Sequence, residues 1–121
     1  MTHSPPPLSG RWQMVRAELN GDAAPELVTQ RTELRLSTTT YEIHFDGEIM
    51  DRGRCELGVD AETRGLILHG EFGPNAGRTI PCIYQLVGDR LRICYGLAGR
   101  APTEFTTAPD QERYLASYRR L

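Results

Sequence analysis

Apolar and polar side chains alternate along most of the chain, in short runs that end at Gly, Asp, Asn or Pro. The clearest run is 31–37, where Thr32, Leu34 and Leu36 share one face, and residues 41–46 repeat the pattern. Such alternation is typical of an antiparallel β-meander, so we predict an all-β, up-and-down barrel of about eight strands. One short helical turn is predicted at 24–28. The predicted strands span residues 10–19, 31–37, 41–45, 49–59, 64–70, 78–87, 90–95 and 112–121.

The Gly88-Asp89 dipeptide predicts the register of one hairpin. A two-residue turn places Val87 opposite Arg90, and the pairing then continues outward along both strands. One face of this hairpin is apolar or aromatic, whereas the other carries two arginines and a glutamine. We therefore predict that the first face points into the barrel. Its members are Cys82, Tyr84, Leu86, Leu91, Ile93 and Tyr95.

Trp12 and the arginines near the end of the chain indicate a closed sheet. Trp12 follows Gly10 in the first predicted strand, and the chain ends Tyr-Arg-Arg-Leu. The two segments meet only if the sheet curls until its first and last strands pair. The indole would then plug one end of a barrel under the guanidinium of Arg120, a cation–π contact of about 0.5–2 kcal/mol. Arg119 is the alternative partner. We predict that Gly10, Trp12 and Arg120 have this structural role in barrel closure.

Four ordered motifs carry a resemblance to a known family. They are Gly-Arg-Trp at 10–12, Ala-Glu-Leu-Asn-Gly at 17–21, the run from Cys to Cys at 82–94, and Arg-Ala-Pro-Thr-Glu-Phe at 100–105. Together they resemble the small lipocalin-like domain first described from planctomycetes. The resemblance implies one lipocalin-like barrel over residues 8–121, after a disordered lead-in at 1–7. No activity is established for that family, so the resemblance implies a fold and leaves the function open.

Composition excludes several classes of function. The formal net charge is −2 with acids and bases interspersed, so we expect neither a nucleic-acid partner nor a membrane. All 14 basic residues are arginine, which excludes Schiff-base and phosphate-loop lysines. The three cysteines have no C-x-x-C spacing, so we expect reduced thiols and no zinc site. Residues 1–7 do not read as a signal peptide, and we expect a cytoplasmic protein without a cofactor.

The candidate ligand-binding residues are three tyrosines and one arginine. Tyr84 and Tyr95 share the inner face of the predicted hairpin, and Tyr41 lies on the apolar face of its own strand. Strict alternation from Trp12 also places Arg16 inside, where a guanidinium would bind an anionic group. We predict a non-enzymatic protein that binds a small apolar or amphipathic molecule inside the barrel.

Two alternative functions remain open. In the first, the barrel is packed solid and presents the 71–77 or 96–111 loop, or a strand edge, to a partner protein or to a second copy in a homodimer. In the second, less favoured alternative, the protein is an enzyme that uses Glu104 and Arg16 at the barrel mouth. No serine, cysteine or carboxylate pair stands in a recognisable catalytic pattern, so we predict no catalytic residue.

Two polar groups are better explained by structure than by chemistry. Glu42, His44 and Asp46 lie on the outward face of one strand, so we interpret them as polar surface and not as metal ligands. Glu104 and Asp110 lie in the long 96–111 connection. We expect Glu104 to help anchor that connection at the barrel mouth, with Phe105 plugging into it.

Overall fold

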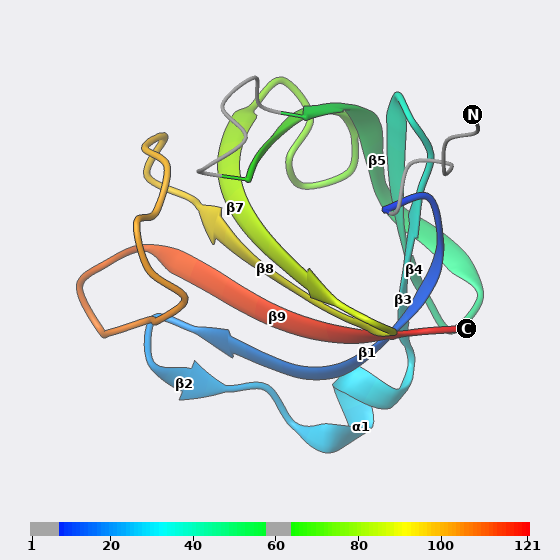
Figure 1. Cartoon of the computed structure of the whole chain (residues 1–121), viewed down its shortest axis with the longest axis horizontal. Helices are drawn as coiled ribbons and strands as arrows, with labels where there is room; N and C mark the ends of the chain where they lie inside the picture. The colour runs from blue at the N-terminus through cyan, green and yellow to red at the C-terminus, as the bar shows by residue number, and fades with distance from the viewer. Residues whose placement is uncertain (1–7, 58–63) are drawn as a thin grey trace.

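The computed structural model describes residues 8–57 and 64–121, most of which lie in antiparallel strands (Figure 1). The expected lead-in at 1–7 and the end of the strand expected at 49–59 lie outside this part of the chain. The elements are β1 Gly10–Leu19, β2 Asp22–Ala23, α1 Glu26–Gln30, β3 Thr32–Leu36, β4 Thr40–Phe45, β5 Glu48–Leu57, β6 Gly65–Phe72, β7 Thr79–Val87, β8 Arg90–Gly96 and β9 Arg113–Arg120.

The strands form one closed sheet. Each strand from β3 to β8 pairs with the next, β1 pairs with β3, and a further pairing of β1 with β9 completes an eight-stranded barrel. The short β2 pairs only with the end of β1 and lies outside the ring. The prediction of an all-β, up-and-down barrel is therefore confirmed. The expected helical turn is present as α1, two residues later than predicted.

The pairing of β1 with β9 buries Trp12. It runs from Trp12 opposite Arg120 to Leu19 opposite Tyr114. Trp12 is 0% exposed, and the Cζ atom of Arg120 lies 4.2 Å from the centre of the indole. The indole N–H donates a hydrogen bond to the Leu8 carbonyl at 3.0 Å, so the polar edge of the buried ring is satisfied.

Arg120, and not Arg119, covers the indole, and Gly10 makes room for it. The Arg120 guanidinium donates to the Ser9 carbonyl at 2.9 Å, whereas Arg119 is exposed. Gly10 has a φ of 137°, and a Cβ atom at this position would lie 2.8 Å from Nη1 of Arg120. The backbone angle therefore favours glycine, and a side chain at this position would push the guanidinium away from where it lies.

A β-bulge in β1 corrects the prediction that Arg16 points inward. The pairing with β9 skips Val15 between Met14 and Arg16. One extra residue reverses the facing of the side chains after it, so Ala17 is buried instead. The Arg16 side chain is 71% exposed and lies 3.2 Å from the Glu18 carboxylate.

The hairpin of β7 and β8 has the predicted register. Val87 lies opposite Arg90, and the pairing continues to Cys82 opposite Tyr95. All of the predicted inward residues belong to the core or pack against it, with Tyr84 and Leu86 only partly buried. The opposite face contributes Cys94, which is buried outside that cluster. Its thiol faces the Thr106 carbonyl in the connection between β8 and β9.

The connection between β8 and β9 is anchored on the outer wall of the barrel. The Arg92 guanidinium lies 4.1 Å from the centre of the Phe105 ring and also donates to the Gln85 side chain at 2.7 Å. Phe105 therefore packs against the outside of β8 and does not plug the mouth, which corrects that expectation. Glu104 and Asp110 are both exposed.

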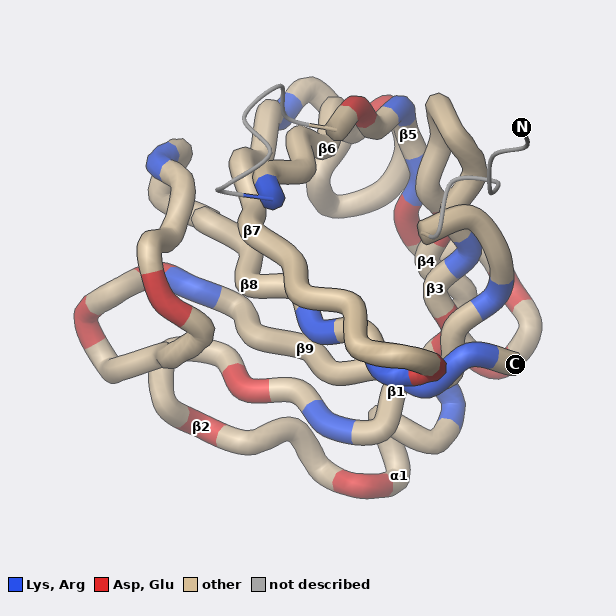
Figure 2. Tube along the Cα trace, viewed as in Figure 1, with Lys and Arg blue, Asp and Glu red and all other residues tan. Residues whose placement is uncertain are grey.

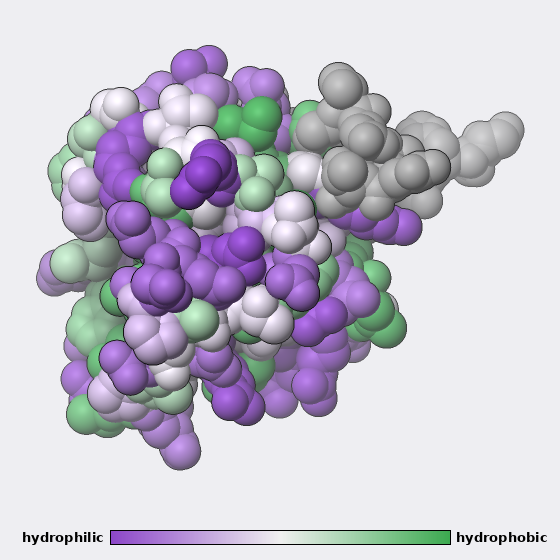
Figure 3. All heavy atoms as spheres, turned by 90° about the vertical axis from the view of Figure 1, so that its left-hand side faces the viewer, coloured by the Kyte–Doolittle hydropathy of each residue, from purple (hydrophilic) through white to green (hydrophobic). Residues whose placement is uncertain are grey.

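Acidic and basic residues are interspersed along the trace of the barrel (Figure 2). The side of the molecule shown in Figure 3 is predominantly hydrophilic, with hydrophobic residues in small groups. Within the part of the chain that is described, no helix is long and apolar enough to cross a membrane.

Candidate functional site

A cavity of about 170 Å³ lies inside the barrel and is partly open to solvent. Inward-facing side chains from most of the strands line it, together with residues of the connections after β6 and β8. Apolar side chains form most of the wall, and four tyrosines, one carboxylate, one amide and one threonine supply polar groups. The lining residues are Met14, Thr32, Tyr41, Ile43, Asp51, Leu68, Asn75, Ile80, Tyr95, Leu97, Tyr114 and Tyr118.

Asp51 lies at the centre of a hydrogen-bond network in this wall. It is 8% exposed. Its Oδ1 accepts a hydrogen bond from the Tyr41 hydroxyl at 3.0 Å, and its Oδ2 accepts one from the Asn75 amide at 2.6 Å. Burial raises the pKa of Tyr41, and the hydrogen bond to Asp51 raises it further. Tyr41 is therefore a neutral donor that holds the carboxylate in place.

The connection between β6 and β7 carries Asn75 into the barrel mouth. Arg78 fixes this segment, because its guanidinium donates to the Asn75 side-chain oxygen at 3.1 Å and to the Leu97 carbonyl at 2.7 Å. The backbone of Asn75 passes so close to Gly70 that a Cβ atom on Gly70 would overlap its carbonyl. Glycine at position 70 is therefore needed to bring the Asn75 amide to Asp51.

Three tyrosines form the wall contributed by β8 and β9. The hydroxyl oxygens of Tyr95 and Tyr118 are 2.8 Å apart, so one donates to the other. The rings of Tyr95 and Tyr114 are 5.4 Å apart at an angle of 41°. Burial raises the pKa of all three hydroxyls above the usual value for tyrosine. They therefore present neutral hydroxyls and aromatic surface to the cavity.

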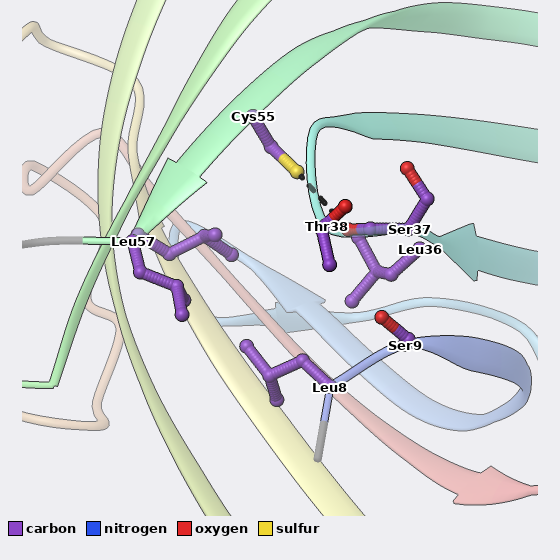
Figure 4. Close-up of a pocket in the computed structure, with 8 residues that line it drawn as sticks. Leu8, Ser9, Leu36, Ser37, Thr38, Cys55 and Leu57 are labelled. Atoms are coloured by element: carbon purple, nitrogen blue, oxygen red, sulfur yellow. Dashed lines mark hydrogen bonds between the residues drawn. The ribbon is translucent and has the colours of Figure 1, made fainter. Parts of the chain in front are cut away.

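A second, smaller cavity of about 80 Å³ is lined in part by Leu8 (Figure 4), whose carbonyl accepts the hydrogen bond from the Trp12 indole. Leu8, Leu36, Leu57 and Leu66 make it apolar. The Cys55 thiol points toward the Ser37 carbonyl, and burial raises its pKa, which makes it a poor nucleophile. Its size and the lack of a charged side chain among the described lining residues make it a weaker candidate for a specific site.

The chain was compared with protein-family models, curated proteins and solved structures. None of them matches it. The site must therefore be interpreted from its own geometry.

Two of the four predicted ligand-binding residues line the larger cavity. Tyr41 and Tyr95 are both there. Tyr84 packs against the core but is not part of this lining, and Arg16 lies on the outside of the barrel. The structure thus brings together only half of the predicted set.

Sequence reasoning missed four polar lining residues: Asp51, Asn75, Tyr114 and Tyr118. The two tyrosines lie four residues apart in the last strand, which places them on the same face, so period-two alternation was a usable signal for them. Asp51 follows a register shift between β4 and β5, and Asn75 lies in an irregular loop. No local pattern marked either as an inward-facing residue.

The candidate metal ligands Glu42 and His44 of β4 and Asp46 just after it do not converge, and His44 is buried, which corrects its interpretation as polar surface. His44 Nε2 lies 2.8 Å from the Glu42 carboxylate, whereas Asp46 lies 3.3 Å from the Arg31 guanidinium. Over residues 8–57 and 64–121, no group of three His, Cys, Asp or Glu side chains is placed to hold a metal ion.

Proposed function

We propose that the protein binds a small, largely apolar molecule inside its barrel and acts as a binding protein, not as an enzyme. The observation that carries this proposal is the interior cavity of about 170 Å³, with apolar walls and a few converging polar groups. Such a lining is typical of sites for small molecules, since the walls give affinity and the polar groups give orientation. The alternative of a solid barrel with exposed interaction loops requires a filled interior, so the cavity favours binding.

The cavity volume limits the size of the ligand. A dry protein cavity of about 150 Å³ accommodates benzene, whereas sites for larger ligands usually measure about 300–1,000 Å³. The ligand proposed here therefore has about one ring, or a short branched chain, of carbon. A long fatty acid would extend well beyond this cavity.

The proposal includes membership of the lipocalin-like family first described from planctomycetes. It is supported by the four ordered motifs between residues 10 and 105 and is compatible with the closed barrel. It adds nothing to the choice of ligand, which rests on the cavity alone.

Titration with toluene and benzyl alcohol tests the proposal. Binding is followed by NMR shifts of the tyrosine ring signals, and native mass spectrometry of the purified protein looks for a retained molecule. We expect saturable shifts from at least one of the two probes. An Ile43→Trp variant, which adds a large side chain to a partly buried lining position, should weaken binding by about tenfold or more.

Val87→Trp is the matched control, because Val87, at the turn between β7 and β8, is 66% exposed and does not line the cavity. It should leave the affinity unchanged. If Ile43→Trp and Val87→Trp bind the probes equally well, the probes do not occupy the cavity and the proposal is wrong.

A further inference from the structure

The charge inside the cavity narrows the class of ligand. Asp51 is the one acidic or basic side chain among the described residues that line the cavity. Burying a carboxylate costs free energy unless other groups compensate its charge. Both hydrogen bonds that Asp51 accepts come from neutral groups, the Tyr41 hydroxyl and the Asn75 amide.

Asp51 can accept more hydrogen bonds than these two. A carboxylate has about four acceptor positions, and each oxygen of Asp51 accepts one hydrogen bond from the described residues. Arg78 is the basic side chain nearest to this network in the chain of hydrogen bonds, but it is exposed. Its guanidinium donates to the Asn75 side-chain oxygen and the Leu97 carbonyl, and not to Asp51. Asp51 forms no ion pair within residues 8–57 and 64–121.

The aromatic walls also favour a positively charged ligand. Tyr41, Tyr95, Tyr114 and Tyr118 surround one cavity, and the Tyr95 and Tyr114 rings are tilted against each other at 5.4 Å. The faces of aromatic rings carry partial negative charge and attract cations. A carboxylate and several aromatic rings therefore attract a positive group and repel an anion.

We propose that the cavity binds a compact amine in its ammonium form, with the ammonium group at Asp51 and its hydrocarbon part against Ile43, Leu68 and Ile80. This inference rests on the proposed function, because it assigns a ligand class to the same cavity. The ammonium donates to the free acceptor positions of Asp51, and the cavity volume limits the hydrocarbon part to about one ring.

A series of probes of equal size separates charge from shape. Benzylamine, benzyl alcohol and benzoate share a single ring and differ in the charge of the polar group. We expect benzylamine to bind about tenfold or more tighter than benzyl alcohol, and benzoate to bind weakest, because a charge-assisted hydrogen bond is stronger than a neutral one. Titration calorimetry measures all three with the full chain at constant ionic strength.

An Asp51→Asn variant removes the charge and keeps the shape. Benzylamine should lose its advantage of about tenfold, whereas benzyl alcohol should bind with similar affinity. Glu48→Gln is the matched control, because it removes one negative charge from an exposed position outside the cavity lining. It should leave the preference for benzylamine intact.

The possible outcomes separate this inference from the proposed function. If benzyl alcohol or benzoate binds as tightly as benzylamine to the unaltered chain, the charge preference is wrong although the barrel still binds small molecules. If none of the three probes binds but toluene does, the amine proposal alone is wrong; if toluene fails as well, both proposals are wrong. The relative affinities of the three probes for the unaltered chain test the charge preference even if Asp51→Asn does not fold.

Discussion

At the scale of single residues, the stacking of Arg120 on Trp12 joins the first and last strands of the barrel. The indole is fully buried, and the guanidinium both covers it and donates to the Ser9 carbonyl. A cation–π contact that is partly shielded from water contributes about 0.5–2 kcal/mol, and the hydrogen bond adds about 1 kcal/mol. Arg120 should therefore matter more for stability than an ordinary surface arginine.

Arg119 and Arg120 provide a matched pair for testing this contribution. We expect Arg120→Ala to lower the free energy of unfolding by about 1–3 kcal/mol. Arg119→Ala should change it by less than about 0.5 kcal/mol, because Arg119 is exposed. Urea unfolding followed by Trp12 fluorescence measures both variants. Equal effects of the two substitutions would show that the stacked guanidinium has no special role.

Glu33 on the outer wall should make stability depend on pH. The hydrogen bond from Arg11 is the largest cause that lowers the Glu33 pKa from 4.5 to about 2, and Arg35 lowers it further. Because this pKa is lower in the folded than in the unfolded chain, the stabilisation is present above pH 4.5 and is lost as the pH falls toward about 2.

The corresponding measurement compares urea midpoints of the unaltered chain and Glu33→Gln over this range. The unaltered chain should be more stable above pH 4.5, and the difference should shrink as the pH approaches 2. Arg11→Gln, which removes the largest cause of the shift, should show a smaller pH-dependent change. A difference between the unaltered chain and Glu33→Gln that does not vary with pH would contradict the assignment.

At the scale of elements, the segment between β6 and β7 positions the polar end of the cavity. Asn75 reaches Asp51 because its backbone lies against Gly70, where no Cβ atom intervenes. Backbone hydrogen bonds of 2.9 Å join Gly70 to Arg78 and Gly77 to Gly70, so the segment is tied down at its base. Displacing it would leave one oxygen of the buried carboxylate without its amide partner.

A Gly70→Ala substitution should displace this segment. Because the added methyl would overlap the Asn75 carbonyl, we expect faster amide hydrogen exchange over residues 73–78 and a loss of stability of about 2–3 kcal/mol. Gly77→Ala is a suitable comparison, since it has a φ of 83° but meets no atom within 4 Å. Its cost should be about 1 kcal/mol, without faster exchange at Asn75. Similar exchange in both variants would be evidence against the close approach at Gly70.

The accuracy of the sequence-based predictions also varied between elements. The register of β7 and β8 was predictable, because a two-residue turn and a one-sided apolar pattern allow a single pairing. The inward position of Arg16 was wrong, because a bulge at Val15 leaves no mark in the alternation of β1. Asp51 and Asn75 were missed for a related reason, since a register shift and an irregular loop decide where they point.

At the scale of the whole molecule, all three cysteines are free and buried. Cys82 lies inside the barrel, where burial raises its pKa strongly. Cys94 lies outside the core and is covered by the connection between β8 and β9, and burial raises its pKa as well. Thiol reactivity therefore reports how the barrel opens, because the two sites become accessible through different motions.

Labelling with a thiol reagent at mildly alkaline pH should show no rapidly reacting cysteine in the native protein, and all three should react in concentrated urea. At low urea we expect Cys94 to react before Cys82, because only an irregular segment has to move away from it. Mass spectrometry of digested samples identifies the modified residue. If Cys82 reacts first, the strands separate more readily than the outer connection, and this account of opening is incorrect.

The pairing of β1 with β9 also has a consequence during translation. Trp12 lies opposite Arg120, so within this barrel β1 is synthesised first and its pairing is completed only when β9, the last strand of the sheet, has been made. Contacts between residues so far apart in sequence form slowly, because a long stretch of chain must be organised before they are made. Until then, β1 can pair with β3 but lacks β9 at its other edge, and this unpaired edge can associate with other nascent chains. A chaperone that holds this segment during synthesis would raise the yield of folded protein.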